Sequence, residues 1–255
     1  PYGDGLWAPD GFTPGAVVSV DIATLKLLPD NAASYRDKIC LAIDHHGSQE
    51  FFAPRTCLDA AAAACGEVLY QIIRLLTDVT PKIALPLYVA VSTDTGCFVY
   101  ANTTSQTHRI AAELMDCGID AAGVNKVLFR TKSPTRLAME ARMVAAMELY
   151  DNGRVVVMSI PLSLCRELNA SESDVEDLSS LAALVQGTDC GITLREQDPH
   201  RVKISVRTGK RVDASAVCRE LGGGGHKGAA GAAVDGTMAE AKAAILAAYR
   251  KATGA

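Results

Sequence analysis

Two short apolar runs near the start of the chain have the pattern of buried strands. Val17–Val20 and Ile39–Ile43 are rich in β-branched side chains and show no regular alternation with polar residues. Such runs are typical of parallel strands that are covered on both faces. Each run ends in an aspartate, Asp21 in the first case and Asp44 in the second. The pattern therefore predicts two carboxylates at the carboxyl ends of neighbouring strands.

Helical periodicity follows these two runs. We expect Asp59 to cap an alanine-rich helix that extends to Leu76. Two further helices are predicted, at residues 105–117, where Gly118 would end the helix, and at residues 133–150. Strands that alternate with helices in this way indicate an α/β layered domain.

A third apolar run, Leu85–Ser92, lies just before Asp94. We predict a strand here, although Pro86 near its start leaves a helix open as the alternative. If the run is a strand, Asp94 follows its carboxyl end, as Asp21 and Asp44 follow theirs.

The pattern changes after a turn signal at residues 151–153, Asp-Asn-Gly. A strand, a helix, a pair of strands and two more helices are predicted beyond it, at 155–160, 172–186, 191–195, 202–207, 214–221 and 237–251. We therefore expect a first domain at 1–130, a helical connector at 131–153 and a second, smaller α/β domain at 154–255.

The composition narrows the functional class. The chain is 49% hydrophobic and 21% charged, as in ordinary soluble proteins, and no apolar run is long enough to span a bilayer. We expect a cytoplasmic protein that does not bind membranes. Its eight cysteines include no C-x-x-C pair, so we expect reduced thiols. The net charge is −4, and because neither half is basic, a long nucleic-acid duplex is an unlikely partner on electrostatic grounds.

The clearest chemical signal is the sequence Asp44-His45-His46 at a strand end. Ligands of open α/β sheets bind beyond the carboxyl ends of the strands, so Asp21 and Asp94 are expected in the same crevice. Carboxylates brought this close repel one another unless a cation neutralises them. Carboxylate and imidazole ligands together suit Mn²⁺, and metal ions of this kind assist phosphoester hydrolysis. For Asp21 or Asp94 alone, a helix cap or a turn is the more common role.

The second signal is the glycine-rich run Leu221–Gly231. Its four successive glycines can expose backbone N–H groups to an anion, and His226 can add a further donor. Arg207, which ends a predicted strand upstream, has a guanidinium suited to a forked phosphate contact. A flexible linker is the alternative. We favour anion binding because predicted helices flank the run on both sides.

Together these residues resemble the DHH phosphoesterase family, in the subgroup that has a DHH-associated C-terminal domain. The resemblance is carried by D-H-H at 44–46 and GGGGHKGAAG at 222–231, and it covers nearly the whole chain. The layout is most similar to the bacterial bifunctional oligoribonuclease and pAp phosphatase, or nanoRNase, type. It implies a parallel-sheet DHH domain with flanking helices at 1–130 and a smaller α/β DHH-associated domain at 154–255.

The resemblance also implies roles for single residues of the first domain. Asp21, His45 and Asp94 are implied to be metal ligands. Asp44, His45 and His46 are implied to be catalytic, with Asp44 orienting the imidazole ligand and His46 also contacting the phosphate. Two Mn²⁺ ions are expected, with Mg²⁺ as an alternative.

For the second domain, the resemblance implies that the substrate is held by Arg207, Gly224, Gly225 and His226. The implied substrates are a short RNA oligonucleotide, a dinucleotide or pAp, and a homodimer is one arrangement to test. The family's first motif, an early strand followed by a histidine and a D-x-D element, is absent from this sequence. The alternatives are therefore a cyclic- or linear-dinucleotide phosphodiesterase and a nucleotide-binding module that lacks activity.

Overall fold

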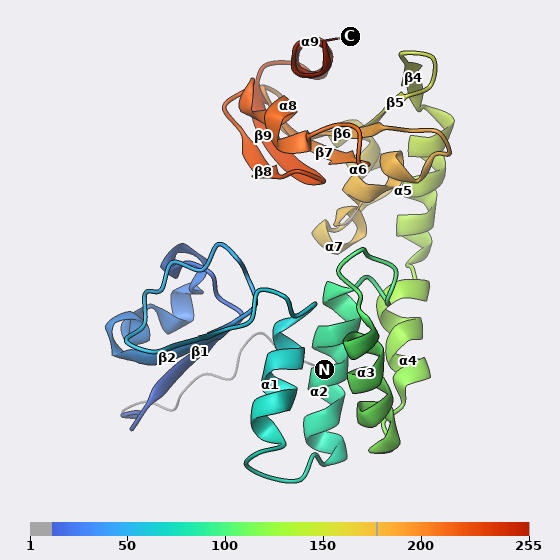
Figure 1. Cartoon of the computed structure of the whole chain (residues 1–255). Coiled ribbons are helices and arrows are strands. Elements are labelled where there is room, and N and C mark those ends of the chain that lie inside the picture. The colour runs from blue at the N-terminus through green and yellow to red at the C-terminus, as the bar shows by residue number, and fades with distance from the viewer. Residues whose placement is uncertain (1–11, 177, 255) are drawn as a thin grey trace. The chain divides into compact units, whose positions relative to one another are not determined.

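The computed structural model describes residues 12–176 and 178–254, which form two compact α/β units (Figure 1). One unit ends at Thr131 and the other begins at Lys132. The α/β fold class predicted from the sequence is confirmed. Among the described residues, no helix is both long and apolar enough to cross a bilayer.

The first unit contains a three-stranded parallel sheet in the order β1-β2-β3. Its strands are β1 (Val17–Val20), β2 (Ile39–Asp44) and β3 (Thr56–Leu58). The parallel pairing of β1 with β2 confirms the two predicted strands. Burial on both faces is wrong for β1, because Val18 and Val20 remain 47% and 39% exposed in the part of the chain that the structure describes.

Within the described part of the first unit, the α-helices are α1 (Cys65–Ile73), α2 (Pro81–Asp94), α3 (Ser105–Asp116) and α4 (Ala121–Asn125). Two 3₁₀ helices, Leu25–Leu27 and Asp30–Lys38, lie between β1 and β2, and a π-helix, Lys126–Arg130, follows α4. The α-helices are held together by a shared apolar core to which Tyr70, Leu87, Tyr88, Ile110 and Leu114 contribute. The helix predicted at 105–117 is confirmed as α3, with Gly118 in the left-handed conformation directly after its cap.

The strand predicted at 85–92 is wrong, because this run lies inside helix α2. Its buried hydrophobic residues are Ala84, Leu87, Tyr88 and Val91, and their spacing is that of one helical face. Pro86 lies on the exposed side, where water can satisfy the carbonyl that proline leaves without an amide donor. The helical alternative was therefore the correct one.

The second unit is built on a six-stranded sheet in the order β4-β5-β6-β7-β9-β8. Its strands are β4 (Glu148–Tyr150), β5 (Val155–Ile160), β6 (Cys190–Asp198), β7 (Arg201–Thr208), β8 (Gly224–His226) and β9 (Ala229–Asp235). Strands β5 and β6 are parallel, and the other neighbours are antiparallel. The strands predicted at 155–160, 191–195 and 202–207 are confirmed.

Helices cover both faces of this sheet. Helices α8 (Ala214–Arg219) and α9 (Met238–Thr253) share a core with the side chains of Ile204 and Val206. The other helical segments of this unit are α5 (Pro134–Ala145), α6 (Leu162–Glu167), α7 (Glu172–Val175) and a 3₁₀ turn at Leu178–Leu184. Met139 and Met143 of α5 belong to the core on the other face of the sheet.

Two predicted helices of the second half are shorter than expected. The segment 133–150 is a helix only to Ala145 and then forms strand β4. The segment 172–186 is divided into α7 and the 3₁₀ turn. The turn packs against β6 so closely that a Cβ added to Gly191 would lie 2.5 Å from the backbone nitrogen of Ala183. This close packing against β6 explains why residues 172–186 do not form one continuous helix.

Candidate active site

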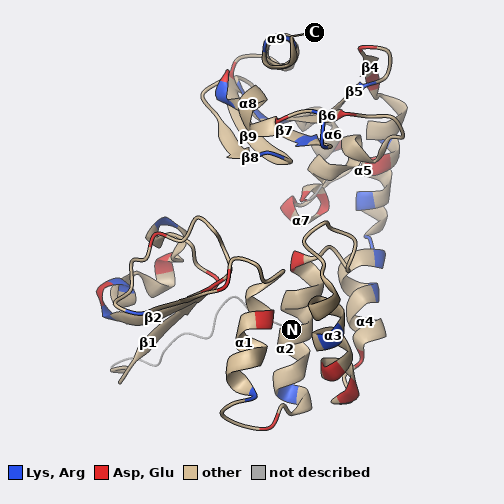
Figure 2. Cartoon of the chain, viewed as in Figure 1, with Lys and Arg blue, Asp and Glu red and all other residues tan. Residues whose placement is uncertain are grey.

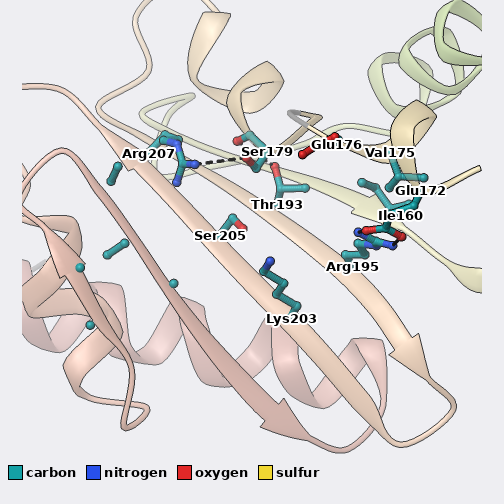
Figure 3. Close-up of a pocket in the computed structure, with 15 residues that line it drawn as sticks. Ile160, Glu172, Val175, Glu176, Ser179, Thr193, Arg195, Lys203, Ser205 and Arg207 are labelled. Atoms are coloured by element: carbon teal, nitrogen blue, oxygen red, sulfur yellow. Dashed lines mark hydrogen bonds and ion pairs between the residues drawn. The ribbon is translucent and has the colours of Figure 1, made fainter. Parts of the chain in front are cut away.

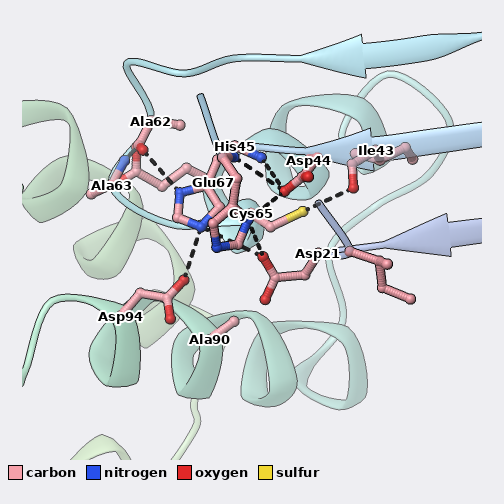
Figure 4. Close-up of polar contacts among 12 residues, drawn as sticks. Asp21, Ile43, Asp44, His45, Ala62, Ala63, Cys65, Glu67, Ala90 and Asp94 are labelled. Carbon is pink, nitrogen blue, oxygen red and sulfur yellow. Dashed lines mark hydrogen bonds and ion pairs between the residues drawn. The ribbon is translucent and has the colours of Figure 1, made fainter. Parts of the chain in front are cut away.

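The carboxyl ends of β1 and β2 bring two aspartates to one edge of the first sheet. Asp21 follows β1 directly, and its backbone N–H donates to the carbonyl of Ile43 at 3.0 Å. Asp21 has a φ of +61°, a left-handed conformation that aspartate tolerates better than most residues. Figure 4 shows its carboxylate directed toward the side chain of His45.

His45 lies between two carboxylates from different elements. Its Nε2 atom is 3.5 Å from Oδ1 of Asp21 and 3.5 Å from Oδ2 of Asp94 (Figure 4). The Nδ1 atom of His46 is 3.6 Å from the same Asp21 oxygen. Asp21, His45 and His46 each offer one ligand atom, and these three atoms lie within 4.8 Å of one another. The structure thus brings two of the predicted metal ligands, Asp21 and His45, into one group. It places the third, Asp94, 3.5 Å from Nε2 of His45 but outside that group.

A backbone carbonyl holds the imidazole of His45 in place. Its Nδ1 atom lies 3.2 Å from the carbonyl oxygen of Ala62, a contact that requires the proton on Nδ1. The lone pair of the neutral ring is then on Nε2, which faces Asp21 and Asp94. An imidazole with one nitrogen bound to a carbonyl and the other free is the usual form of a metal ligand.

Asp44 is fully buried, and both of its carboxylate oxygens have protein donors. Oδ1 accepts from the backbone N–H of His45 at 2.7 Å, from that of His46 at 3.2 Å and from Nδ1 of His46 at 2.8 Å. Oδ2 accepts from Nε2 of Gln49 at 2.6 Å. Asp44 therefore orients the ring of His46 and the backbone of His45, while Ala62 orients the ring of His45.

These hydrogen bonds decide the charge of Asp44. Burial alone would raise the pKa of Asp44, but the side-chain hydrogen bond from His46 and the backbone N–H groups of His45 and His46 outweigh burial and lower the pKa below its usual value. Asp44 is consequently ionised at neutral pH and presents a fixed negative charge behind the two histidines.

Asp94 is the last residue of helix α2, and its environment disfavours its charge. Burial first, and the negative charge of Asp21 second, raise the pKa of Asp94 above its usual value, although His45 and His46 act in the opposite direction. The carboxyl end of a helix also carries partial negative charge. Among the described residues, no lysine or arginine forms an ion pair with Asp21 or Asp94. The donor set and its excess negative charge therefore fit a divalent cation.

Cys65 lies beside this cluster but does not belong to the donor set (Figure 4). Its thiol donates to the carbonyl of Ile43 at 3.4 Å. Burial and then the negative charge of Asp21 raise the pKa of Cys65 to about 12, so the sulfur stays protonated. A site of carboxylates and imidazole without thiolate suits Mn²⁺ or Mg²⁺ better than structural Zn²⁺.

The alanine run at 60–64 is irregular, although a helix was predicted to begin at Asp59. Helix α1 begins only at Cys65, and its N-cap is Ala64. Alanine has the highest helix propensity, so contacts elsewhere must outweigh it. The carbonyls of Ala62 and Ala63 accept hydrogen bonds from His45 and Asn102, which helical geometry would prevent. These two hydrogen bonds explain why helix α1 begins at Cys65 rather than at the start of the alanine run.

The second unit contains a cavity of about 500 Å³ on the face of the sheet opposite α8 and α9 (Figure 3). Arg207, Gly224 and Gly225, all predicted from the sequence to hold substrate, contribute to its wall. The Nη2 atom of Arg207 donates to the hydroxyl of Ser179 at 3.3 Å. His226 is exposed on β8 and is not among the residues that line this cavity.

Two cations of the cavity were missed by sequence reasoning, Lys203 and Arg195. Alternation along a strand places Lys203, Ser205 and Arg207 on one face, and Lys203 pairs with Arg195 across the strands. The alternation of Lys203, Ser205 and Arg207 along the predicted strand was the sequence signal that could have identified Lys203. The Nη1 and Nη2 atoms of Arg195 donate to the two carboxylate oxygens of Glu172 at 2.8 and 2.5 Å. No ion pair of Lys203 occurs among the described residues.

The glycine run serves packing as well as access to the cavity. A Cβ on Gly223 would lie 2.2 Å from the carbonyl oxygen of Gly231, and one on Gly225 would lie 2.6 Å from Cα of Ala230. Gly224 has open space at this position. Gly223, directly before β8, and Gly225 within it are thus required for the close approach of this segment to β9. Gly224 leaves the backbone open toward the cavity.

Positive and negative side chains are mixed on the described elements that Figure 2 shows. Figure 2 shows lysine and arginine interspersed with aspartate and glutamate on the elements of both units. The cations of the cavity are therefore a local feature, which suits a small phosphorylated ligand better than a long polymer.

Known proteins with related sequences and structures match most of the chain. The DHHA1 domain model matches residues 152–254. The bifunctional oligoribonuclease and PAP phosphatase NrnA of Thermus thermophilus is 32% identical over 238 residues, which are 92% of this chain and 67% of that protein. The protein of the same name from Bacillus subtilis is 24% identical over 86% of this chain and 70% of its own length. This chain thus spans about two thirds of the Thermus relative.

A solved structure shows the same fold. The exopolyphosphatase-related protein from Bacteroides fragilis superposes with a TM-score of 0.84 and 23% sequence identity. The match covers 94% of this chain and 72% of that protein. At this level of identity the likeness concerns the fold.

Proposed function

This chain belongs to the DHH phosphoesterase family of bifunctional oligoribonucleases and PAP phosphatases, as the sequence predicted, and we propose that it hydrolyses short oligoribonucleotides and pAp to mononucleotides. The observation that carries the proposal is the placement of His45 between Asp21 and Asp94, with both carboxylates 3.5 Å from Nε2. A divalent cation would relieve the repulsion between these carboxylates, and metal-assisted phosphoester hydrolysis uses such a cation.

Asp21, His45 and Asp94 would hold the metal ion, for which we propose Mn²⁺, with Mg²⁺ as the alternative. When bound, such an ion lowers the pKa of water and polarises a phosphoryl oxygen. Asp44 keeps the His46 ring in one orientation through the bond to Nδ1, so Nε2 of His46 is available to contact the phosphate.

We propose that the second unit binds the substrate. Arg207 and Lys203 would contact phosphate groups, while Gly224 and Gly225 offer backbone to the same cavity. We assign His226 to the outer part of this site, because it follows Gly225 on β8. A cavity of about 500 Å³ is within the range of small-ligand sites and supports a nucleotide or a short oligonucleotide as the substrate.

We propose the same roles for the three segments as the sequence predicted: metal binding at 1–130, a connector at 131–153 and substrate binding at 154–255. The connector contains α5, whose Met139 and Met143 are buried in a core of the second unit. A cytoplasmic location and a homodimer also stay predictions. The eight cysteines, all free, suit a reducing compartment.

A nucleotide-binding module without turnover is the second candidate. The observation in its favour is the number of ligands: Asp21, His45 and Asp94 suffice for one ion, whereas two ions are expected in the complete family site. A dinucleotide phosphodiesterase differs from the main proposal only in the substrate that fills the cavity.

A turnover assay distinguishes these candidates. The full chain is incubated with Mn²⁺ and pAp, a 5′-phosphorylated diribonucleotide or a cyclic dinucleotide, and products are separated by chromatography. We expect mononucleotide from the first two substrates, no product with a chelator, and loss of turnover in His45→Ala but not in the matched control His200→Ala. Turnover that survives His45→Ala would refute the metal assignment. Binding without product, lost in Arg207→Ala, would favour the module.

A further inference from the structure

One side chain outside the ligand set joins the two halves of the metal site. The side-chain amide of Asn102 donates from Nδ2 to the carbonyl oxygen of Ala63 at 3.0 Å and to that of Asp94 at 3.0 Å. An amide nitrogen has two hydrogens, and these two contacts use both. Asn102 therefore ties the loop that precedes α1 to the end of α2.

On the loop that precedes α1, the peptide group next to the one bound by Asn102 contacts His45. The carbonyl of Ala62 and the N–H of Ala63 belong to one planar peptide group. The carbonyl accepts from Nδ1 of His45 at 3.2 Å, and the N–H donates to Oε2 of the buried Glu67 at 3.4 Å. The next carbonyl, that of Ala63, is the one that Asn102 holds. Two successive peptide groups are thus fixed by side chains from elsewhere.

The loop depends on such partners because its own side chains cannot hold it. Residues 60–64 are all alanine, which offers neither a hydrogen bond nor a long apolar group. Without external contacts these residues would extend helix α1, since alanine is the strongest helix former. In a helix, the carbonyl of Ala62 would bind a backbone amide instead of His45.

The other end of the tie is set by an unusual turn after α2. Gly96, Cys97 and Phe98 have φ values of +55°, +57° and +66°, so three successive residues are left-handed. Such a conformation costs free energy for residues other than glycine and persists where the surrounding structure requires it. Here it reverses the chain after Asp94, and Asn102 can then reach the carbonyl of Asp94.

These contacts form a closed ring. It runs from the imidazole of His45 through Ala62 and Ala63 to Asn102, then to Asp94, and returns across the 3.5 Å between Oδ2 of Asp94 and Nε2 of His45. We propose that Asn102 is a positioning residue that sets the distance between His45 and Asp94 and thereby the affinity for the metal. The inference rests on the metal site of the proposed function.

The position of Asn102 makes the inference testable. Its side chain is exposed, so its removal leaves no cavity in the core. We expect water to replace its hydrogen bonds with little effect on stability, but water cannot impose the same geometry on the ring. Partners that orient metal ligands from behind typically change metal affinity by about 10- to 100-fold when they are mutated.

The experiment compares Asn102→Leu, which keeps the approximate size but removes both donors, with Asn102→Ala. Asn31→Leu is the matched control, because Asn31 is also exposed and lies in the same unit. Mn²⁺ binding to the chelator-stripped full chain is measured by isothermal titration calorimetry without substrate. Melting of the metal-free protein and the kinetic constants for pAp are measured in parallel.

We expect both Asn102 variants to bind Mn²⁺ about 10- to 100-fold more weakly than wild type. Their metal-free melting temperatures should match wild type, and kcat should fall while KM is retained. Asn102 variants that bind Mn²⁺ as wild type does, or that lose metal-free stability in proportion to affinity, would overturn the inference. A wild-type chain that binds no Mn²⁺ would instead refute the metal site itself.

Discussion

Asp44→Asn tests whether a buried negative charge organises the D-H-H segment. Asparagine has nearly the shape of aspartate, and its Oδ1 can still accept from His45 and His46. Its Nδ2, however, would face Nε2 of Gln49, which donates to Oδ2 of Asp44 in the wild type. Gln49 cannot turn its amide around without loss, because Nε2 also donates to the carbonyl of Ile22 at 2.9 Å.

The size of the effect follows from the four hydrogen bonds to Asp44. One bond to a charged acceptor is lost outright, which costs about 1.5–3 kcal/mol. The three bonds to Oδ1 lose their charge assistance, at about 1 kcal/mol each. Because the three share one oxygen they are not additive. We expect the free energy of unfolding of the metal-free protein to fall by about 3–5 kcal/mol at neutral pH, as for other broken buried pairs.

The loss should depend on pH in a defined direction. Burial would raise the pKa of Asp44, but the hydrogen bonds from His46 and the backbone lower it below its value in the unfolded chain. The stabilisation is therefore fully present above the unfolded pKa of about 3.9 and is lost as the pH falls through the lower folded pKa. Wild type and Asp44→Asn should differ most at neutral pH and converge in acid.

Urea denaturation followed by circular dichroism measures this difference. The experiment is done at neutral pH and near pH 3 with a chelator present, and Asp37→Asn, an exposed aspartate of the same unit, is the control. A loss below about 1 kcal/mol at neutral pH, or a loss that stays constant in acid, would refute the role of the buried charge.

Three further substitutions distinguish the proposed metal site from the proposed substrate site. Asp94→Asn removes the repulsion by Asp21, so thermal melting should show a more stable metal-free protein and a smaller gain from Mn²⁺; a less stable metal-free variant contradicts this. Arg207→Ala should weaken pAp binding by about 10- to 100-fold in calorimetry and leave Mn²⁺ binding intact; weaker Mn²⁺ binding would place Arg207 in the wrong site. Glu172→Gln should free Arg195 and tighten pAp binding with little change in stability; weaker binding would make the pair structural.

The sequence alone indicated which side chains meet at the first site. An apolar run that ends in Asp44-His45-His46 places these groups beyond a strand, because parallel strands end at a common edge. The same rule brought Asp21 to that edge, as the structure shows. Asp94 lies beside His45, as the sequence predicted, but it ends a helix rather than a strand. A strand or a helix formed by the apolar run would both end next to Asp94, so both predictions place this residue at the end of an element.

In the second unit, the sequence indicated Arg207 and the glycine run but not the cavity as a whole. Lys203 and Arg195 are ordinary charged residues in the printed sequence. Only the register of β6 and β7 makes them neighbours on one face. Strand pairing joins residues that are distant along the chain, so no local pattern reports which cations share a wall.

The alanine run shows where tertiary structure overrules local preference. Residues 60–64 favour a helix by every local measure, yet they form a loop because His45, Glu67 and Asn102 bind its peptide groups. Composition and periodicity thus determined which groups this protein has and the strand ends that carry two of its carboxylates. Only the tertiary structure determined which peptide groups bind the side chains of the site, such as the carbonyl of Ala62 that accepts from His45. These hydrogen bonds join segments that are far apart in the sequence.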